Sequence, residues 1–361
     1  AASDVYKRQD NQYAKMVDQK TNYLLGKPVT FDCENDGVLN IMYEKIEENY
    51  GLFDSGVVVL EKTQNVTKYQ IDCNTPDGTM YCYHLFQGID LAYTTFYANS
   101  CFQRKNSLPH IIEIAYCRSG RYECEYKRGF MTYLGENDLA VSIINSQRNE
   151  PIFPTGIYEG VALIINTDII GECFHAPVIG IEIDFAGLIQ KFCYEQCCVV
   201  MKTPPELLHV FEEICDCTYR GNLGYLRLKA LEIFFLLSNL STQDNIETSA
   251  YYSGETIAKV KALKSALMEQ LDRKISLPEL AEQYGLSLTM LKDCFKAVYG
   301  KPVHAFRREY KMQVATKLLT TTDMSITELA GEFGYENPNK FSTAFKEVIG
   351  VSPRAYRAKN K

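Results

Sequence analysis

Tryptophan is absent from this 361-residue sequence, and the short patterns that signal a metal site are missing as well. Its 13 cysteines form no C-x-x-C pair, and its 5 histidines form no H-x-H pair. Structural zinc clamps are usually built from such C-x-x-C pairs. We therefore expect no metal and no other cofactor, and we expect most cysteines to pack as small apolar side chains.

Long apolar segments are lacking too. No apolar run approaches the ~18 residues that a membrane-spanning helix needs, and the first residues lack the pattern of a signal peptide. These absences predict a cytoplasmic protein that keeps its thiols reduced and does not contact a membrane. The cysteines leave one alternative open, which is a redox or metal sensor that uses the thiols between Cys193 and Cys198.

Charge is distributed unevenly along the chain. Residues 255–361 carry 18 Lys and Arg against 12 Asp and Glu, a net charge of +6, whereas the remaining residues carry 20 against 33, a net charge of −13. A basic excess confined to one part of a chain is typical of proteins that bind nucleic acid. Because the excess is modest, the sequence predicts specific and salt-sensitive binding rather than general attraction to polyanions.

A duplicated pattern lies inside this basic part. The first copy reads SLPELAEQYGLS (276–287) and FKAVYGKPVHAFR (295–307), and the second reads SITELAGEFGYEN (325–337) and FKEVIGVSPRAYR (345–357). Gly285 and Gly334 lie 49 residues apart, whereas Phe295 and Phe345 lie 50 apart. The second copy therefore has one additional residue in its turn.

Each copy predicts two short helices joined by a glycine turn. Ser276 with Glu279, and Ser325 with Glu328, have the spacing of a capping box, which starts a helix. Apolar residues then recur at helical spacing until a glycine ends the first helix of each copy.

The second helix of each copy, at about residues 288–298 and 338–348, has a polar outer side and a buried apolar side. This arrangement is a helix-turn-helix with its recognition helix, present twice. Residues 303–319 contain no helix breaker and predict one stiff helix between the copies. The two recognition helices could then enter successive major grooves about 34 Å apart. The alternative is a small-molecule-binding or sensory protein whose helical bundle serves for protein contacts.

Residues 258–361 resemble the DNA-binding domain of the AraC/XylS family of bacterial transcription regulators. The segments that carry the resemblance are LAEQYGLS, LKDCFKAVYG, YKMQVATKLL (310–319) and SITELAGEFGYENPNKFSTAFKEVIGVSPRAYR (325–357). They lie in a little over a quarter of the chain. The resemblance implies a sequence-specific regulator that binds double-stranded DNA, with RNA polymerase and a second copy of the chain, as a homodimer, among its further partners. One departure is Lys311, where the family often has an arginine with its bidentate fork.

Helical phase, together with position in the family's motif, identifies the residues that we expect to contact DNA. Those expected near base edges are Thr289, Lys292, Asp293, Asn339, Lys340 and Thr343. Lysine can donate to guanine, asparagine can pair with adenine, and aspartate can accept from cytosine. Those expected at the phosphate backbone are Lys296, Lys346, Arg354 and Arg357.

Strand patterns dominate the chain before these copies. One alternating strand is expected within residues 57–71, and further strands are expected at 80–86, 89–97, 110–117, 121–127, 129–134, 138–144 and 158–166. Short strands at this spacing predict a closed or sandwiched β unit. AraC-type regulators often carry a cupin-like barrel in this place, and residues 111–142 resemble that sensory barrel.

A barrel of that kind implies a pocket for a small-molecule effector, and the residues expected to line it are Glu113, Tyr116 and Arg118. Cupin folds can also hold catalytic metals, which need several histidines and a carboxylate around one ion. The barrel segment offers only two histidines, His84 and His110, with the carboxylates of Glu113 and Glu123. We therefore expect no enzyme activity, with a cupin enzyme tethered to DNA as the alternative.

The fold class expected from these patterns is α+β. The domains are an atypical N-terminal segment (1–40), a cupin-like β-barrel sensory domain (41–170), a helical dimerisation region with a linker (171–254) and an all-α domain with two helix-turn-helix units joined by a long helix (255–361). Apolar helical patterns near residues 204–240 favour packing against the barrel or pairing with a second chain.

Residues 11–31 resemble a segment of tailed-phage portal proteins, so we interpret residues 1–40 as extraneous to the regulator. The alternative for this segment is an ordinary amphipathic helix.

Overall fold

The computed structural model describes residues 57–73, 78–101, 108–127, 129–144, 151–170, 173–175, 182–193, 198–216, 220–240, 248–273 and 276–360. The expectations for residues 1–40, and for the linker at 241–247, lie outside the described residues. Within the described part, no helix combines the length and the apolar character that crossing a membrane requires.

An antiparallel sheet makes up most of the N-terminal part. Its strands are β1 (Val57–Lys62), β2 (Val66–Ile71), β3 (Gly78–Phe86), β4 (Ile89–Phe96), β5 (Leu108–Lys127), β6 (Phe130–Gly135), β7 (Asp138–Ile144), β8 (Tyr158–Asn166), β11 (Cys198–Lys202) and β12 (Tyr252–Ser253). Their order is β1-β2-β3-β4-β8-β5-β6-β12, and β7 pairs with both β5 and β11. The short strands β9 (Cys173–His175) and β10 (Glu182–Asp184) pair separately. Among the described residues the sheet does not close, so the closed cupin-like barrel stays a prediction.

One strand replaces the two that the sequence predicted at 110–117 and 121–127. β5 runs without interruption through the turn that was expected at Ser119 and Gly120. A bulge next to Ser119 and a φ of 85° at Gly120 bend the strand instead. A Cβ at Gly120 would lie 1.9 Å from the Ile157 carbonyl oxygen, so only glycine permits this close approach. The first half of β5 can thereby pair with β7 and β8, while the second half pairs with β6.

A turn divides the single alternating strand that was expected within residues 57–71, so this expectation was wrong. The Thr63 N–H donates to the Val66 carbonyl at 2.9 Å, and the Thr63 hydroxyl accepts from the Val66 N–H at 3.1 Å. Threonine forms such local hydrogen bonds in place of strand pairing. The strands β1 and β2 on either side of this turn pair with each other.

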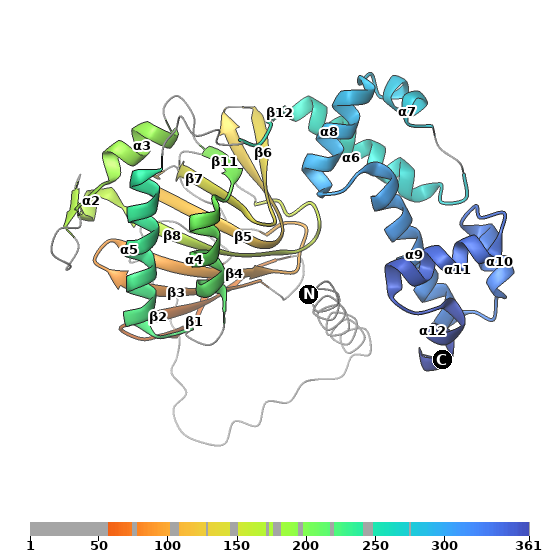
Figure 1. Ribbon diagram of the computed structural model, residues 1–361, viewed down its shortest axis with the longest axis horizontal. Helices are drawn as coiled ribbons and strands as arrows, with labels where there is room; N and C mark the ends of the chain where they lie inside the picture. Colours follow the sequence, from red (N-terminus) through yellow and green to blue (C-terminus); the bar gives the residue numbers. More distant parts are fainter. Residues whose placement is uncertain are drawn as a thin grey trace, which may run out of the picture. The chain divides into compact units, whose positions relative to one another are not determined.

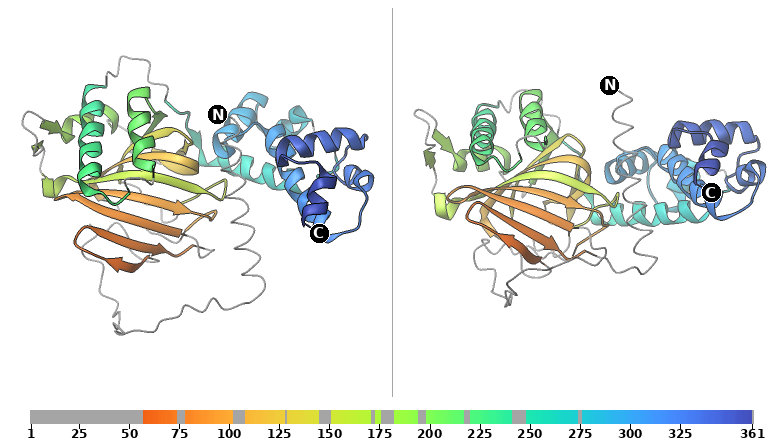
Figure 2. Two further views of the ribbon diagram at one scale, coloured as in Figure 1. Left: turned by 60° about the horizontal axis from the view of Figure 1, so that its bottom comes forward. Right: turned by 90° about the horizontal axis from the view of Figure 1, so that it is seen from below.

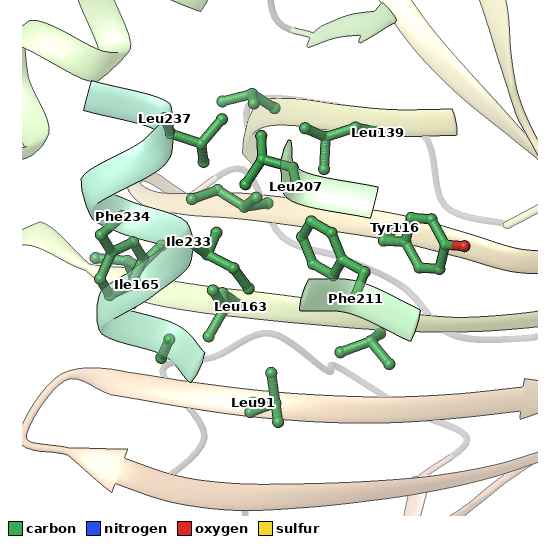
Figure 3. Close-up of a cluster of buried hydrophobic side chains, with 14 of the residues drawn as sticks. Leu91, Tyr116, Leu139, Leu163, Ile165, Leu207, Phe211, Ile233, Phe234 and Leu237 are labelled. Atoms are coloured by element: carbon green, nitrogen blue, oxygen red, sulfur yellow. The ribbon is translucent and has the colours of Figure 1, made fainter. Parts of the chain in front are cut away.

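Helices cover one face of the sheet. α3 (Phe185–Cys193), α4 (Pro205–Cys215) and α5 (Leu223–Asn239) lie together on that side, whereas the short α2 (Thr167–Ile170) follows β8 directly (Figures 1 and 2). Figure 3 shows Phe211 of α4 and Ile233 of α5 next to Leu163 of β8, and all three side chains are fully buried. Burying a side chain of this size contributes roughly 1.5–3 kcal/mol. The helices expected near residues 204–240 therefore pack against the sheet.

The C-terminal helices are α6 (Gly254–Glu269), α7 (Leu277–Gln283), α8 (Leu288–Tyr299), α9 (Val303–Thr321), α10 (Ile326–Glu332), α11 (Pro338–Ile349) and α12 (Pro353–Asn360). They enclose two hydrophobic cores, one around Phe295 of α8 and the other around Phe345 of α11. α9 contributes Val303 to the first core and Met312 and Leu319 to the second. The long helix expected at 303–319 is therefore present and belongs to both units (Figure 1).

Candidate DNA-binding surface

The turn of each unit depends on a left-handed glycine. Gly285 follows α7 with a φ of 61°, and Gly334 follows α10 with a φ of 72°. A residue with a side chain loses roughly 1–2 kcal/mol in this conformation. At Gly334 an added Cβ would also lie 2.1 Å from the Asp272 carbonyl oxygen. The second turn can therefore approach the segment after α6 only because it carries glycine.

Side-chain caps start both recognition helices. The Ser287 hydroxyl accepts from the Met290 N–H at 3.1 Å at the start of α8. The Asn337 side chain accepts from the Asn339 N–H at 2.8 Å at the start of α11. Such a cap satisfies one of the N–H groups that lack a partner inside the helix, which fixes where each helix begins.

Only one of the two predicted capping boxes is formed. The Ser325 hydroxyl accepts from the Glu328 N–H at 3.2 Å, and the Glu328 carboxylate accepts from the Ser325 N–H at 2.7 Å. These hydrogen bonds lower the pKa of Glu328. Ser276 caps α7 without a side-chain hydrogen bond, so the box predicted with Glu279 was wrong. Pro278 removes one of the N–H groups that a capping side chain can bind, and the Ser276 backbone differs from that of Ser325.

All six residues expected at base edges are exposed on α8 and α11. They are Thr289, Lys292 and Asp293 on α8, and Asn339, Lys340 and Thr343 on α11. Their spacing places each group of three on one side of its helix. The opposite side of each helix is buried, through Leu291 and Phe295 in α8 and through Phe341 and Phe345 in α11. The structure thus brings each group together, and its contact with bases stays a prediction.

The four residues expected at phosphates differ in their surroundings. Lys296, Lys346 and Arg354 are exposed. Arg357 is half-buried, and its guanidinium donates to the carbonyl oxygens of Leu319 at 3.1 Å and Met324 at 2.6 Å. These hydrogen bonds hold α12 against the end of α9. The structure therefore assigns Arg357 a role within the domain, which sequence spacing did not reveal.

In the described part of the chain, the lysines of the recognition helices form no ion pairs with acidic side chains. Among the described residues, Lys292, Lys296, Lys340 and Lys346 form no ion pair, whereas Arg308 pairs with an exposed glutamate. An ammonium group without a carboxylate partner keeps its charge available for a phosphate or a base edge. The two recognition helices therefore present positive charge outward.

Lys311 lies between the two units on α9. Its ammonium donates to the carbonyl oxygen of Phe333 at 2.7 Å and lies 5.6 Å from the ring centre of Tyr335. Burial and the neighbouring charge of Arg307 lower the pKa of Lys311 to about 8. The single carbonyl contact needs one donor, so lysine suffices where an arginine fork was expected from the family.

A contact of the C-terminal helices with the sheet was not expected from the sequence. β12 pairs with β6, so the chain before α6 adds a short strand to the sheet. Lys261 of α6 donates to the Glu123 carboxylate at 2.8 Å, and Tyr133 donates to the same carboxylate at 2.8 Å. The Glu123 side chain is 1% exposed, so it is a buried charge with an ion-pair partner and a hydrogen bond.

The residues expected to line an effector pocket lie on different sides of the sheet. Tyr116 faces the helices, where its ring stacks on Phe211 at 4.9 Å between ring centres. Glu113 is an odd number of residues away on β5 and therefore faces the other side. Arg118 donates to the carbonyl oxygen of Cys215 at 3.1 Å. A small hollow of about 30 Å³ lies beside Arg118.

The histidines considered for a cupin-type metal site do not converge. His84 Nδ1 lies 2.9 Å from the Asp90 carboxylate, whereas His110 Nδ1 lies 3.6 Å from the exposed carboxylate of Asp168. Glu123 is occupied by its ion pair with Lys261. The constellation that the enzyme alternative requires is therefore not assembled from these residues.

The C-terminal helices are similar to domains of known proteins. Residues 280–359 match the family model of a helix-turn-helix domain. The HTH-type transcriptional activator RhaS of Escherichia coli O139:H28 is 28% identical over 127 residues, which are 35% of this chain and 43% of that protein. The HTH-type transcriptional activator RhaR of Mannheimia succiniciproducens is 26% identical over 129 residues, 36% of this chain and 45% of that protein. Among solved structures, the C-terminal domain of AraT, a response regulator from Geobacillus stearothermophilus, is 29% identical and covers 28% of this chain and 84% of that one, with a TM-score of 0.27.

The C-terminal part of the chain is thus a helix-turn-helix domain. Its type is that of the AraC regulators, which confirms the resemblance found in the sequence. The chain spans less than half the length of the curated relatives that it matches. The sheet lies outside the residues that the family model covers.

Proposed function

We propose that this protein is a sequence-specific DNA-binding regulator of transcription. The observation that carries the proposal is the duplicated helix-turn-helix, in which two capped recognition helices expose polar residues and share α9. A shared helix can hold two recognition helices at a fixed separation, as binding to successive major grooves requires. The similarity to two transcriptional activators supports the same function.

Base reading and phosphate contact are assigned to different side chains. Thr289, Lys292 and Asp293 of α8, and Asn339, Lys340 and Thr343 of α11, read base edges. Lys296, Lys346 and Arg354 contact phosphates and set the register of the domain on the duplex. Both roles are consistent with the exposure of these side chains, and with recognition-helix lysines that form no ion pair within the described part of the chain.

Control by a small effector bound to the N-terminal sheet is a further part of the proposal. The Lys261–Glu123 ion pair and the pairing of β12 with β6 connect that sheet to the first helix-turn-helix unit. A change in the sheet would therefore reach α6 through a buried contact.

Dimerisation is proposed for α5, where Leu228 is 63% exposed and Phe235 is 52% exposed.

The assignment of roles predicts two different effects on binding. DNA sites selected from a random pool by the purified chain supply a specific duplex and, after scrambling, a nonspecific one. Asn339→Ala should weaken binding to the specific duplex by about 1–3 kcal/mol and leave nonspecific binding almost unchanged. Lys346→Ala should weaken both duplexes to a similar extent and reduce the salt dependence by about one phosphate contact.

The outcomes separate the proposal from its main alternative. A pool that yields no enriched sequence, with no binding of the wild-type chain to DNA at low salt, would favour a helical domain used for protein contacts. Equal effects of Asn339→Ala and Lys346→Ala on both duplexes would leave DNA binding intact but refute base reading by α11.

A further inference from the structure

Cys82, His84 and Asp90 form a compact group on β3 and β4, away from the proposed DNA surface. One ligand atom of each residue lies within 4.8 Å of the other two. Cys82 and His84 are two residues apart on β3 and share a face of the sheet. Asp90 lies directly opposite His84 on β4. Three different side chains that zinc commonly binds therefore meet at one place.

A bulge in the β3–β4 hairpin creates this arrangement. Phe86 pairs with Ile89 across the two-residue turn, and a regular hairpin would then place His84 opposite Leu91. The register shifts by one residue between Phe86 and His84, so His84 faces Asp90 instead. The group thus depends on a local irregularity in the sheet rather than on sequence spacing.

Hydrogen bonds orient the imidazole of His84 at both nitrogens. Nδ1 lies 2.9 Å from the Asp90 carboxylate, and Nε2 lies 3.1 Å from the Thr67 hydroxyl oxygen. Burial, together with the charge of Asp90 and a hydrogen bond to it, raises the pKa of the Cys82 thiol.

The group has small neighbours across the strands and reaches solvent on one side. Cys82 pairs in register with Thr67 on β2 and with Ala92 on β4, so small side chains flank the thiol on the same face. Cys82 and Asp90 are each 3% exposed. The His84 side chain is 33% exposed and gives the group an open side.

We propose that Cys82, His84 and Asp90 bind a zinc ion. Thiolate, imidazole and carboxylate together form a ligand set typical of zinc, and three protein ligands leave the fourth tetrahedral position for water or an exchangeable ligand. With Nδ1 on the metal, Nε2–H donates to Thr67, which supplies the second contact that orients a metal-bound histidine. The site lies within one sheet and does not depend on the proposed DNA binding.

Cobalt(II) is a suitable probe, because a bound cysteine thiolate gives it a charge-transfer absorption in the near ultraviolet. The purified full-length chain, treated with a chelator, should bind one Co²⁺ per chain with that absorption, and Zn²⁺ should displace it. Cys82→Ser should abolish the absorption. Cys117→Ser, which removes a buried thiol outside the group, should retain it.

Two milder variants keep the test valid if Cys82→Ser fails to fold. His84→Gln should lower Co²⁺ affinity at least about tenfold, and Thr67→Val should lower it by about 10–100-fold through the lost orienting contact. Circular dichroism of the metal-free proteins verifies that each variant is folded. The proposal is overturned if the wild-type chain shows no thiolate absorption, or if Cys82→Ser folds and the absorption is unchanged.

Discussion

Arg307 and Arg357, at equivalent positions of the two helix-turn-helix units, each hold the end of the preceding long helix. Arg307 donates to the carbonyl oxygen of Gln270, the C-cap residue of α6, at 2.5 Å, and to that of Arg273 in the following loop at 2.7 Å. Arg357 donates to the carbonyl oxygens of Leu319, near the end of α9, and Met324, just after it. The last carbonyl groups of a helix lack partners inside it, and a guanidinium can bind several of them. The duplication therefore repeats a tertiary contact as well as a sequence pattern.

Removing either guanidinium should destabilise the unit to which it belongs. Arg307→Met and Arg357→Met keep an apolar stem but lose the donors, and each should lower the free energy of unfolding by about 1–3 kcal/mol. Urea unfolding followed by circular dichroism measures the change. Arg308→Met is the matched control, because Arg308 forms an exposed ion pair with Glu347 and should cost less than about 1 kcal/mol. If Arg357→Met weakens DNA binding without changing stability, its main partner is a phosphate.

Gly334→Ala and Gly331→Ala should have opposite effects on stability. At Gly334 the left-handed φ and the Asp272 carbonyl 2.1 Å from an added Cβ predict a loss of at least about 2 kcal/mol. At Gly331 nothing lies within 4 Å of an added Cβ, and alanine should stabilise α10 by about 0.5–1 kcal/mol. Thermal unfolding of the two variants distinguishes them. Similar behaviour would mean that the turn adapts to a side chain at Gly334.

The unequal caps of α7 and α10 predict unequal costs of serine removal. Ser325→Ala removes one half of a complete capping box and should cost about 1 kcal/mol. Ser276→Ala removes a hydroxyl that makes no capping hydrogen bond and should change stability by less than about 0.5 kcal/mol. Denaturant unfolding of both variants, measured in one buffer, gives the comparison. A cost at Ser276 equal to that at Ser325 would show that both boxes form in solution.

Lys311 predicts a rise in stability with pH in alkaline solution. Its pKa is lowered from 10.5 to about 8 in the folded protein, mainly by burial. Between these values the unfolded chain binds more protons than the folded one, so stability increases as pH rises through this range. Lys311→Met removes the contribution, and its stability relative to the wild-type protein should therefore fall between pH 8 and 10.5. A constant difference across the range would show that the ammonium is better solvated than its contacts suggest.

Local signals in the sequence were sufficient to predict the C-terminal helices. Capping residues, left-handed glycines and apolar spacing all act within one or two helical turns, and α8, α9 and α11 begin at the residues that these signals indicate. Ser276 is an exception, because proline changed the donors available to its hydroxyl. The side chains expected to contact bases were inferred from helical phase and from their position in the family. The structure shows that these side chains are exposed.

Features that depend on pairing between distant strands were not predictable in the same way. The continuous β5 requires Ile157, far along the chain, to approach Gly120. The sequence offered Glu123 as a candidate metal ligand, and its ion pair with Lys261 could not be foreseen, since the two residues lie 138 positions apart. The group around Cys82 escaped notice because a bulge sets the register of its hairpin. Each of these features is determined by tertiary contacts that no short pattern encodes.

The sharing of α9 by two hydrophobic cores has a consequence for the DNA that such a domain would recognise. Each residue added to an α-helix rotates the subsequent part of the chain by about 100° and moves it by about 1.5 Å. An insertion near the middle of α9 would thus turn one recognition helix away from the duplex, while both cores could still fold. The length of α9 then sets the distance between the two DNA half-sites that one chain reads. Substitutions on a recognition helix could therefore change the sequence of either half-site far more readily than the distance between the half-sites.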